Sequence, residues 1–357
     1  MSETILLTGG LGYIGSHCAV ELLNAGYRVI LVDNLCNSHE DTLEKIRATC
    51  ATRLIPDSDV SESDVVAYMN ENCVFFNVDL ANAGECRARL WAIFEEFPIA
   101  AVIHLAAHKS VPESVEDPIV YFKNNLFSLT HVLDAMDKFE VHRLIFSSSA
   151  TVYGDCRVAS PKPNGQIAET AEKQPTNPYG QTKWFGEQMC ESMARAWAES
   201  NHGVRVIALR YGNPVNSRPD LPENPRGAAM NLFNVAMEVV QGTRDKLCIF
   251  GDDYPTPDGT GVRDFIHVVD LAEAHVAALR SSPEKGVYDV FNVGIGHGYS
   301  VLDIVGGLEQ VNQTEIPREI VARRPGDVAS LVFDVSRAKT QLNWQAQRTT
   351  LLDLCQK

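Results

Sequence analysis

Tyr179 and Lys183 form a pair of side chains that could remove a proton from an alcohol. They lie in the segment Asn177–Lys183 (NPYGQTK), and a spacing of four residues puts both on one face of a helix. An ammonium group near a phenol favours the phenolate and so lowers a pKa that ordinarily lies near ~10. A phenol with a lowered pKa can accept the proton of a sugar hydroxyl. Amphipathic helices with a buried tyrosine and a solvated lysine show the same spacing, so this chemistry also requires a hydride acceptor, a second hydroxyl and a substrate pocket.

A glycine-rich turn near the start of the chain predicts a dinucleotide site. The apolar run Thr4–Thr8 is typical of a buried parallel strand, and an apolar helical pattern covers Ser16–Asn24. Between them lie Gly9, Gly12 and Gly15. Glycines let the backbone turn sharply and approach a pyrophosphate, whose charge then meets the N–H groups of the helix N-terminus. Because a strand and a helix flank the glycines, we interpret the turn as a phosphate-binding fingerprint.

Asp33 follows a second predicted strand, Tyr27–Val32, and favours NAD as the cofactor. A carboxylate at this position can accept hydrogen bonds from the adenosine ribose hydroxyls. Asn34, Asn37 and Ser38 extend the polar site, and no arginine follows directly. The carboxylate would repel the additional phosphate of NADP, whereas a helix-capping role for the aspartate is the alternative.

Three further predicted strands end in residues suited to a ligand site. They are 74–78, followed by Asp79 and Leu80; 100–105, followed by Ala106 and Ala107; and 142–147, followed by Ser148 and Ser149. A sixth strand is predicted over 204–211, and long helices over 120–137 and 179–198. This alternation predicts an α/β protein with a Rossmann-like doubly wound parallel sheet, in which ligands bind beyond the carboxyl ends of the strands. Ser149 is therefore a candidate donor to the reacting hydroxyl.

The character of the sequence changes after Tyr211. Residues 212–227 are rich in proline, asparagine and arginine and predict a long irregular segment. Helices near 228–241 and 268–279, with short strands near 248–250, 287–293 and 320–321, predict a smaller C-terminal α/β substrate lobe. We therefore divide the chain into an NAD-binding domain, 1–211, and a substrate lobe, 212–357, some of whose elements return to the first domain. The polar and acidic stretch 53–71 is interpreted as a surface excursion.

The composition excludes several classes of protein. The formal net charge of −15 over 357 residues argues against nucleic acid or an anionic membrane as a partner. The nine cysteines, without a C-x-x-C pair, fit the reduced thiols of a cytoplasmic protein. His104 and His108 are four residues apart, but His104 belongs to an apolar strand, so we expect packing there and no metal site. No apolar run approaches the ~20 residues of a membrane span, and the strand beginning at Thr4 leaves no room for a signal peptide.

Eight segments spread over nearly the whole chain carry longer motifs. They are TGGLGYIGSH from Thr8, VDNLCNS from Val32, VIHLAAHKSVPESV from Val102, FSSSATVYG from Phe146, NPYGQTK from Asn177, LRYGNP from Leu209, IFGDDYPTPDGTGVRDFIHVVDLA from Ile249 and RRPGD from Arg323. Together they resemble the UDP-galactose 4-epimerases of the extended short-chain dehydrogenase/reductase family. The last two segments are far more specific than the glycine-rich fingerprint.

The resemblance implies the interconversion of UDP-galactose and UDP-glucose with a tightly held NAD. Tyr179 would remove the proton of the sugar 4-hydroxyl while hydride passes to the nicotinamide. The resulting 4-keto sugar would turn over, and hydride would return to its other face. Lys183 matches the lysine that binds the nicotinamide ribose and keeps the tyrosine ionised. Ser149 matches the hydroxyl that hydrogen-bonds the reacting oxygen.

The resemblance also assigns binding residues. Those expected at the cofactor are Gly9, Gly12, Tyr13, Ile14, Gly15, Asp33, Asn34, Asn37, Ser38, Asp79, Leu80, Leu105, Ala106, Ala107, Lys109, Asn124, Ser149, Tyr179, Lys183 and Tyr211. Those expected at UDP or the sugar are Lys109, Ser149, Asn213, Asn231, Leu232, Cys248, Phe250, Arg263, Arg324, Asp327 and Leu331. Arg263 and Arg324 offer guanidinium forks that suit a diphosphate. Solvated surface arginines are the alternative interpretation of these two positions.

Three features depart from the family pattern. Gly212 stands where the family usually has phenylalanine, so we expect a wider pocket or a looser strand end. Leu331 stands at the position said to control N-acetylated sugars, which a large aromatic residue excludes and a small residue admits. Leucine is intermediate and leaves UDP-N-acetylglucosamine open as a substrate. The short stretch after Leu342 puts the packing of the last helix in doubt.

Other activities remain to be weighed against epimerisation. A nucleotide-sugar 4,6-dehydratase needs an additional acid and base, normally an Asp-Glu pair after the serine, and Ala150-Thr151 disfavours it. A net-oxidising dehydrogenase would have to exchange its cofactor at each turnover. A non-catalytic nucleotide-sugar sensor would be expected to lack Ser149, Tyr179 or Lys183. The family forms homodimers through the helices beginning near Val120 and Tyr179, whose apolar faces could equally cover the sheet.

Overall fold

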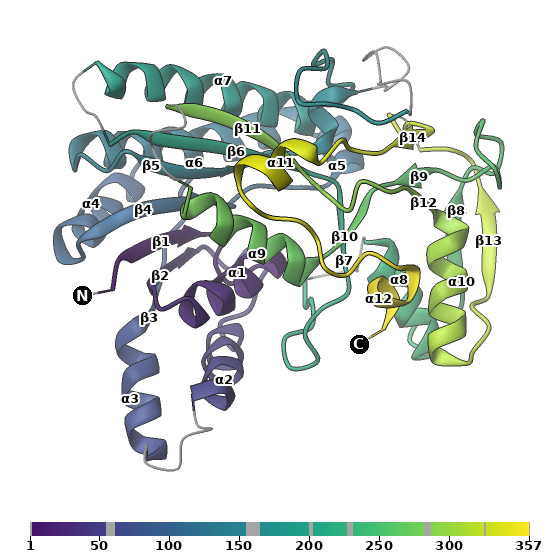
Figure 1. The fold of residues 1–357 in the computed structure, drawn as a ribbon, viewed down its shortest axis with the longest axis horizontal. Helices are drawn as coiled ribbons and strands as arrows, with labels where there is room; N and C mark the ends of the chain where they lie inside the picture. The colour runs from purple at the N-terminus through teal and green to yellow at the C-terminus, as the bar shows by residue number, and fades with distance from the viewer. Residues whose placement is uncertain are drawn as a thin grey trace.

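A seven-stranded sheet, parallel throughout, forms the centre of the molecule (Figure 1). The computed structural model describes residues 2–54, 61–154, 165–199, 203–226, 231–281, 287–324 and 326–356. In spatial order the strands are β11 (Tyr288–Val293), β6 (Arg205–Tyr211), β5 (Arg143–Ser147), β4 (Ile99–His104), β1 (Thr4–Thr8), β2 (Arg28–Asp33) and β3 (Cys73–Asn77). The strand order reverses between β1 and β4, which is where doubly wound sheets bind ligands. The predicted α/β class is confirmed.

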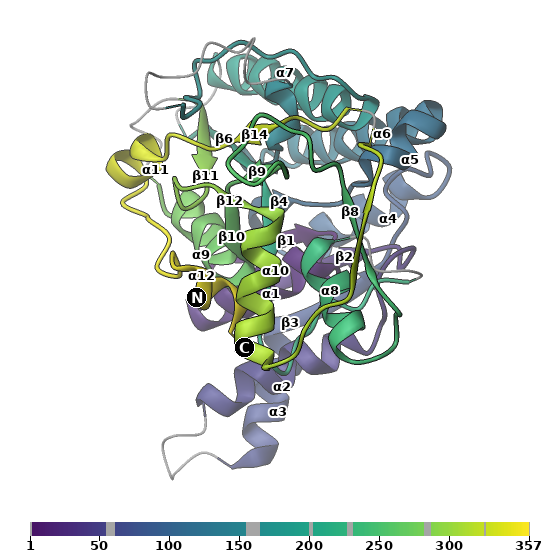
Figure 2. The ribbon, with the colours of Figure 1, turned by 90° about the vertical axis from the view of Figure 1, so that its right-hand side faces the viewer.

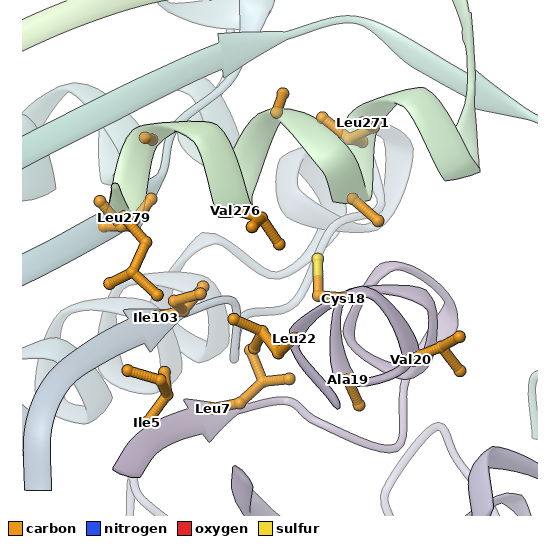
Figure 3. Packing of buried hydrophobic residues seen from close by; sticks show 14 of the residues in the cluster. Ile5, Leu7, Cys18, Ala19, Val20, Leu22, Ile103, Leu271, Val276 and Leu279 are labelled. Atoms are coloured by element: carbon orange, nitrogen blue, oxygen red, sulfur yellow. The ribbon is translucent and has the colours of Figure 1, made fainter. Parts of the chain in front are cut away.

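Alternating side chains of the strands build two separate cores. Leu7 of β1 and Ile103 of β4 face the helices α1 (Tyr13–Asn24) and α9 (Val268–Leu279), as Figure 3 shows. Leu6 and Val102, the alternate residues, face the other core with α4 (Cys86–Glu96), α6 (Pro118–Lys138) and α7 (Pro178–Ala198). A two-residue side-chain period places successive residues on opposite faces, so both faces of the sheet are covered.

Strand β11 and helix α9 follow residue 212 but pack with the sheet. β11 pairs with β6 over its whole length, with Tyr288 opposite Val206 and Val293 opposite Tyr211. Helix α9 packs against α1 and carries Leu271 and Val276 into the same core. The polypeptide therefore returns from the C-terminal lobe to the sheet layer before β12 and α10 follow.

The C-terminal lobe has its own core and three small sheets (Figure 2). The helices α8 (Leu232–Val240), α10 (Val301–Asn312) and α12 (Leu351–Cys355) surround Phe233, Ile304 and Leu354. The sheets consist of β7 (Asn213–Val215) with β10 (Phe265–His267); β8 (Leu247–Phe250) with β13 (Arg318–Val321); and β9 (Val262–Arg263) between β12 (Tyr299–Ser300) and β14 (Ser330–Leu331). The remaining helical segments are α2 (Thr42–Leu54), α3 (Glu62–Asn72), α5 (Val111–Glu116), the 3-10 turn η1 (Ala150–Tyr153) and α11 (Ser336–Gln341).

Two sequence expectations are wrong in this fold. The stretch 53–71 is more than a surface excursion, because helix α3 packs against β2 and β3 and buries Val65 and Met69. The last helix is firmly packed, since Leu354 and Cys355 of α12 are buried and α12 lies against α10. The predicted helix start at residue 228 lies outside the described residues, and α8 is described from Leu232.

Candidate active site

The glycine turn between β1 and α1 forms a close-fitting backbone cradle. Gly9 has a φ of +67°, and a Cβ atom there would lie 2.9 Å from the backbone nitrogen of Ala106. A Cβ at Gly15 would lie 2.1 Å from the carbonyl oxygen of Gly9. Gly12 begins helix α1 without a side-chain cap. The strand end and the helix N-terminus thus approach each other with backbone N–H groups available for an anion, as a pyrophosphate requires.

Asp33 organises the turn and the loop that follows β2. Its buried carboxylate accepts hydrogen bonds from the backbone nitrogen of Leu11 (3.1 Å), the backbone nitrogen of Leu35 (2.9 Å) and the hydroxyl of Ser38 (2.9 Å). Two ionised oxygens offer about four acceptor positions, so at least one remains for a ribose hydroxyl. Asn34 bridges to Asp79 after β3 (3.4 Å).

Asn125 joins the end of β4 to the two long helices. Its side-chain oxygen accepts from the His108 nitrogen (2.8 Å), and its amide donates to the His108 carbonyl (3.1 Å) and the Thr182 hydroxyl (3.0 Å). Asn124 in turn donates to the Asn125 oxygen (3.0 Å). The loop that carries Ala106, Ala107 and Lys109 is therefore held in a fixed relation to the helix of Tyr179.

Lys183 and Glu187 attach the inner face of α7 to the ends of β5 and β6. The Lys183 ammonium donates to the carbonyl oxygen of Ser147 (2.7 Å). Glu187, one turn further on, accepts from Ser148 and forms a buried ion pair with Arg210 (2.5 Å). Residues four apart share a helix face, so these contacts also fix Tyr179, one turn before Lys183. Burial lowers the pKa of Lys183 to about 8.

Tyr179 and Ser149 are paired across the sheet edge. Burial raises the pKa of Tyr179, and its hydrogen bond with Ser149 opposes this effect. The Ser149 oxygen accepts from the backbone nitrogen and the hydroxyl of Thr151, at 3.2 and 2.9 Å, so its own proton is directed elsewhere. The expected lowering of the tyrosine pKa by Lys183 is wrong for this structure. The ammonium is bound to Ser147 and lies 5.9 Å from the centre of the phenol ring.

A cavity of about 90 Å³ lies beside this pair and contains part of the predicted substrate site. Its walls are Val111, Ala150, Thr151, Gly154, Thr176, Asn177, Gly212, Asn213, Arg263, Asp264, Gly326, Asp327, Val328 and Leu331. Leu331 on β14 pairs with Arg263 on β9, which brings the predicted gate next to a predicted diphosphate ligand. The structure therefore joins Asn213, Arg263, Asp327 and Leu331 to the end of the Tyr179 helix.

The expectation of a looser strand end at Gly212 is wrong, whereas the wider pocket stays a prediction, because Gly212 itself lines the cavity. A Cβ at Gly212 would lie 2.9 Å from the carbonyl oxygen of Asp264 and 3.8 Å from a ring carbon of Phe333. Phe333, which is fully buried and forms an isolated bridge with Ile167, therefore lies at ordinary contact distance from such a Cβ. β6 ends at Tyr211 and β7 begins at Asn213, paired with β10, so the chain stays in regular structure.

The other predicted substrate residues do not line this cavity. Arg324 is exposed, donates to Asp327 (3.0 Å) and lies 4.5 Å above the ring of Phe250. Cys248 lies two residues before Phe250 on β8. Asn231 and Leu232 begin helix α8, and the Asn231 amide reaches Lys109 only through the carboxylate of Glu223. Tyr211 is buried with its hydroxyl bonded to Ser147.

Several groups that support the site escaped the sequence analysis. Thr151 stands where a dehydratase has an acidic residue, and its hydroxyl donates to Ser149. Glu187 and Arg210 lay within recognised segments, but nothing in their spacing indicated a pair. Glu223 lay in a segment interpreted only as irregular. The contacts of Glu187 and Glu223 reach far along the chain, so the spacing of neighbours carries no signal for them.

The described residues contain no helix long and apolar enough to cross a membrane. Within the same ranges, no group of three or more histidine, cysteine or acidic side chains could hold a metal ion. His104 instead bonds Thr8 through its ring nitrogen (2.9 Å).

The geometry agrees with comparisons to known proteins. The chain is 41% identical over 346 residues to a UDP-glucose 4-epimerase of Bacillus subtilis. The aligned region covers 96% of this chain and 92% of that protein. A UDP-glucose 4-epimerase of Dictyostelium discoideum is 41% identical over 350 residues, covering 97% and 92%. The crystal structure of a UDP-glucose 4-epimerase from Bifidobacterium longum in complex with NAD+ and UDP superimposes with a TM-score of 0.84 at 38% identity, covering 99% of this chain and 96% of that one. The model of the NAD-dependent epimerase/dehydratase family matches residues 5–294, and the chain belongs to this family.

Proposed function

We propose that this protein is an NAD-dependent UDP-glucose 4-epimerase that interconverts UDP-galactose and UDP-glucose. The observation that carries the proposal is the Tyr179–Ser149 pair at the sheet edge shared by the glycine cradle and the arginine-lined cavity. The curated relatives at about 40% identity are named for this activity, and they match this chain over nearly its full length.

The residues of the cradle fit NAD. A Cβ at Gly9 or Gly15 would fill the space beside the uncapped start of α1, and Asp33 retains an acceptor position for the ribose. Asn34, Asn37, Ser38, Asp79 and Leu80 would surround the adenosine. Gly12, Tyr13, Ile14, Leu105, Ala106, Ala107, Lys109, Asn124 and Tyr211 would complete the site. When bound, NAD supplies the reversible redox chemistry at carbon 4 of the sugar.

Tyr179 is the proposed base and acid at the 4-hydroxyl. Its hydroxyl and that of Ser149 are partners, so a sugar oxygen between them would meet one group that accepts its proton and another that stabilises it. Thr151 directs the Ser149 proton into the site. Lys183 holds the helix at Ser147 and would bind the nicotinamide ribose from there.

The arginines are the proposed ligands of the diphosphate. Arg263 lines the cavity, and Arg324 stands beside Asp327, which is also in the cavity wall. A guanidinium group binds phosphate oxygens in a bidentate manner. Phe250 and Cys248 on β8, with Asn231 and Leu232 at the start of α8, would hold the uridine. Asn213 and Leu331 would contact the sugar.

The cavity chemistry favours epimerisation over dehydration. Elimination of water needs a second acid and base near the sugar, and the described residues of the cavity wall include two carboxylates, Asp264 and Asp327. Both oxygens of Asp264 accept backbone hydrogen bonds from residues 295, 296 and 333. Asp327 is bound to Arg324. Intact Ser149, Tyr179 and Lys183 argue against a non-catalytic sensor.

A homodimer through α6 and α7 and a cytoplasmic location are part of the proposal. A groove of about 680 Å³ runs between the outer faces of these helices, lined by Leu133, Phe185, Met189 and Met193 among others. Phe127 and Phe185 are 48% and 42% exposed, which is unusual for large apolar side chains unless a partner covers them.

The eight described cysteines are free thiols, which fits a reducing compartment.

The decisive experiment supplies purified protein with UDP-galactose and no added NAD, and separates the nucleotide sugars. UDP-glucose should accumulate to an equilibrium mixture, and NAD should be released when the protein is denatured. Folded protein that carries NAD yet forms no UDP-glucose would contradict the proposed function. Net formation of NADH in step with substrate loss would indicate a dehydrogenase.

A further inference from the structure

Glu223 collects three donors from two regions that the sequence analysis assigned to ligands. Its side chain is only 6% exposed. One carboxylate oxygen accepts from the Lys109 ammonium (2.9 Å), and the other accepts from the amides of Asn231 and Asn234 (2.6 Å each). A buried carboxylate is costly unless it is paired and hydrogen-bonded, and here both conditions are met.

The segment that carries Glu223, residues 216–226, crosses the nucleotide-binding half of the molecule. The Tyr13 hydroxyl donates to the Asn216 carbonyl (2.5 Å), and the Arg218 nitrogen donates to the His17 ring (3.2 Å). At the other end, the Arg226 guanidinium donates to the Ser38 carbonyl (2.7 Å). Tyr13 and His17 lie one turn apart on α1, so the segment is fixed along one face of that helix.

Lys109 and Asn231 come from the two different halves of the molecule. Lys109 follows β4 in the nucleotide-binding half, and its ammonium lies 5.9 Å from the centre of the Tyr13 ring. Asn231 begins α8 in the C-terminal lobe, and its side chain does not cap that helix. The amide is bound to Glu223 instead, so the same carboxylate sets the positions of both residues.

We propose that Glu223 is a positioning residue for nucleotide-sugar binding, which holds Lys109 and the start of α8 together. The identity of the ligand in this inference rests on the proposed function. The contacts of Glu223 with its three donors do not depend on it. Glu223 acts through its partners and does not touch the reacting atoms. Its removal should therefore weaken binding of the UDP moiety and leave the chemical step largely intact.

Glu223→Gln is the sharpest variant, because it keeps the size of the side chain and removes the charge. A glutamine has one acceptor oxygen, so its NH2 group must face either the ammonium of Lys109 or the two amides, all of which are donors. Loss of one charge-assisted hydrogen bond corresponds to roughly a tenfold change in an equilibrium constant. The KM for UDP-galactose and the Kd for UDP should both rise roughly tenfold, with kcat changed by less than about twofold.

Two further variants separate positioning from folding. Asn234→Ala removes one donor without altering a predicted ligand residue, and should raise the same two constants by roughly threefold. Glu238→Gln is the matched control. Glu238 lies on α8, as Asn234 does, and pairs with Arg244 (2.8 Å), outside the cluster around Glu223. It should leave KM, kcat and Kd at wild-type values.

A double-mutant cycle tests the link to Lys109. Lys109→Met and Glu223→Gln should be non-additive, so that the double variant binds UDP no more weakly than the worse single variant. Additive losses, unchanged KM and Kd in both Glu223→Gln and Asn234→Ala, or a fall in kcat and thermal midpoint at constant KM would each overturn the inference. Calorimetric binding of UDP requires no turnover. A wild-type protein that binds UDP without epimerising therefore contradicts the proposed function alone, and one that binds no UDP contradicts both.

Discussion

The ammonium group of Lys183 donates a 2.7 Å hydrogen bond to the carbonyl oxygen of Ser147, the last residue of β5. Ser149 follows two residues later and is the hydrogen-bond partner of Tyr179. The lysine thus fixes the helix of the proposed base against the strand of the proposed donor. The geometry of the pair therefore depends on this hydrogen bond between α7 and β5.

Replacing Tyr179 with phenylalanine should remove the proposed acid and base while keeping the ring. We expect turnover of UDP-galactose to fall by roughly 10²- to 10⁴-fold, the usual contribution of general acid–base catalysis. NAD released from the denatured variant should match the wild-type amount, since the cradle is unchanged. Tyr68→Phe, an exposed tyrosine on α3, is the control. Near-normal turnover in Tyr179→Phe would mean that another group is the base.

Gly212 should tolerate a side chain poorly. Gly212→Ala places a Cβ 2.9 Å from the Asp264 carbonyl oxygen, and the free energy of unfolding in urea should fall by about 1–3 kcal/mol. Gly212→Phe should cost more, and adding Phe333→Ala should recover part of that loss by vacating the space in front of the strand. Gly306→Ala is the control, because a Cβ there meets nothing within 4 Å. Equal stability of Gly212→Ala and wild type would show that the backbone around Asp264 can move to accommodate the methyl group.

Leu331 should influence which sugars are accepted. The side chain is 6% exposed and lines the cavity of about 90 Å³, so a tyrosine ring would fill much of that volume. Leu331→Tyr should lower kcat/KM for UDP-N-acetylglucosamine more than for UDP-glucose, because the acetamido group needs the lost space. Rates with both substrates are measured for both proteins. An unchanged ratio between the two substrates would refute control by this position.

The free energy of unfolding should decrease as the pH is lowered, because of His275. This buried histidine donates from Nδ1 to the Leu271 carbonyl oxygen (2.8 Å), and burial lowers its pKa to about 4. The unfolded chain, with a pKa near ~6.5, binds a proton that the folded chain excludes, so stability is lost as pH falls from 6.5 towards 4. His275→Phe should remove about 1.4 kcal/mol per pH unit from that slope. The rest of the pH dependence should remain in the variant. It comes from His17, His104 and His267, whose pKa values burial also lowers.

This prediction is checked by urea unfolding at several values between pH 4.5 and 7. The slope of the unfolding free energy against pH is compared between wild type and His275→Phe. Parallel slopes would show that His275 is not protonated on unfolding in this range.

The exposed face of α6 and α7 should mediate self-association. Phe185→Glu introduces a charge into the groove, so light scattering after gel filtration should show a monomer where the wild type is a dimer. Leu352→Glu, at an exposed apolar residue of α12, is the control and should remain dimeric. A monomeric wild type, or an unaffected dimer in Phe185→Glu, would contradict the proposed interface.

Features that depend on neighbours in the sequence were predictable. The six strands of the first half, the glycine turn, Asp33 and the Tyr179–Lys183 spacing all follow from short-range patterns, and the structure contains those strands and that helix within a few residues of the expected bounds. The meeting of strand ends at one edge follows from the parallel order. The short-range patterns predicted a strand near 287–293 and a return of some elements to the first domain. They could not identify that strand as the seventh of the sheet, because a return to the sheet depends on the path of the whole lobe.

The sequence by itself determined the doubly wound sheet, the cofactor cradle and the three polar groups of the proposed chemistry. Only the tertiary structure decided how they are held and what limits the pocket. The Asp264 carbonyl closely approaches Gly212, the Lys183 ammonium binds Ser147, and Glu223 accepts from Lys109, Asn231 and Asn234. Most of these contacts join residues far apart in the chain, where close packing and the pairing of buried charges select partners that no local period can encode.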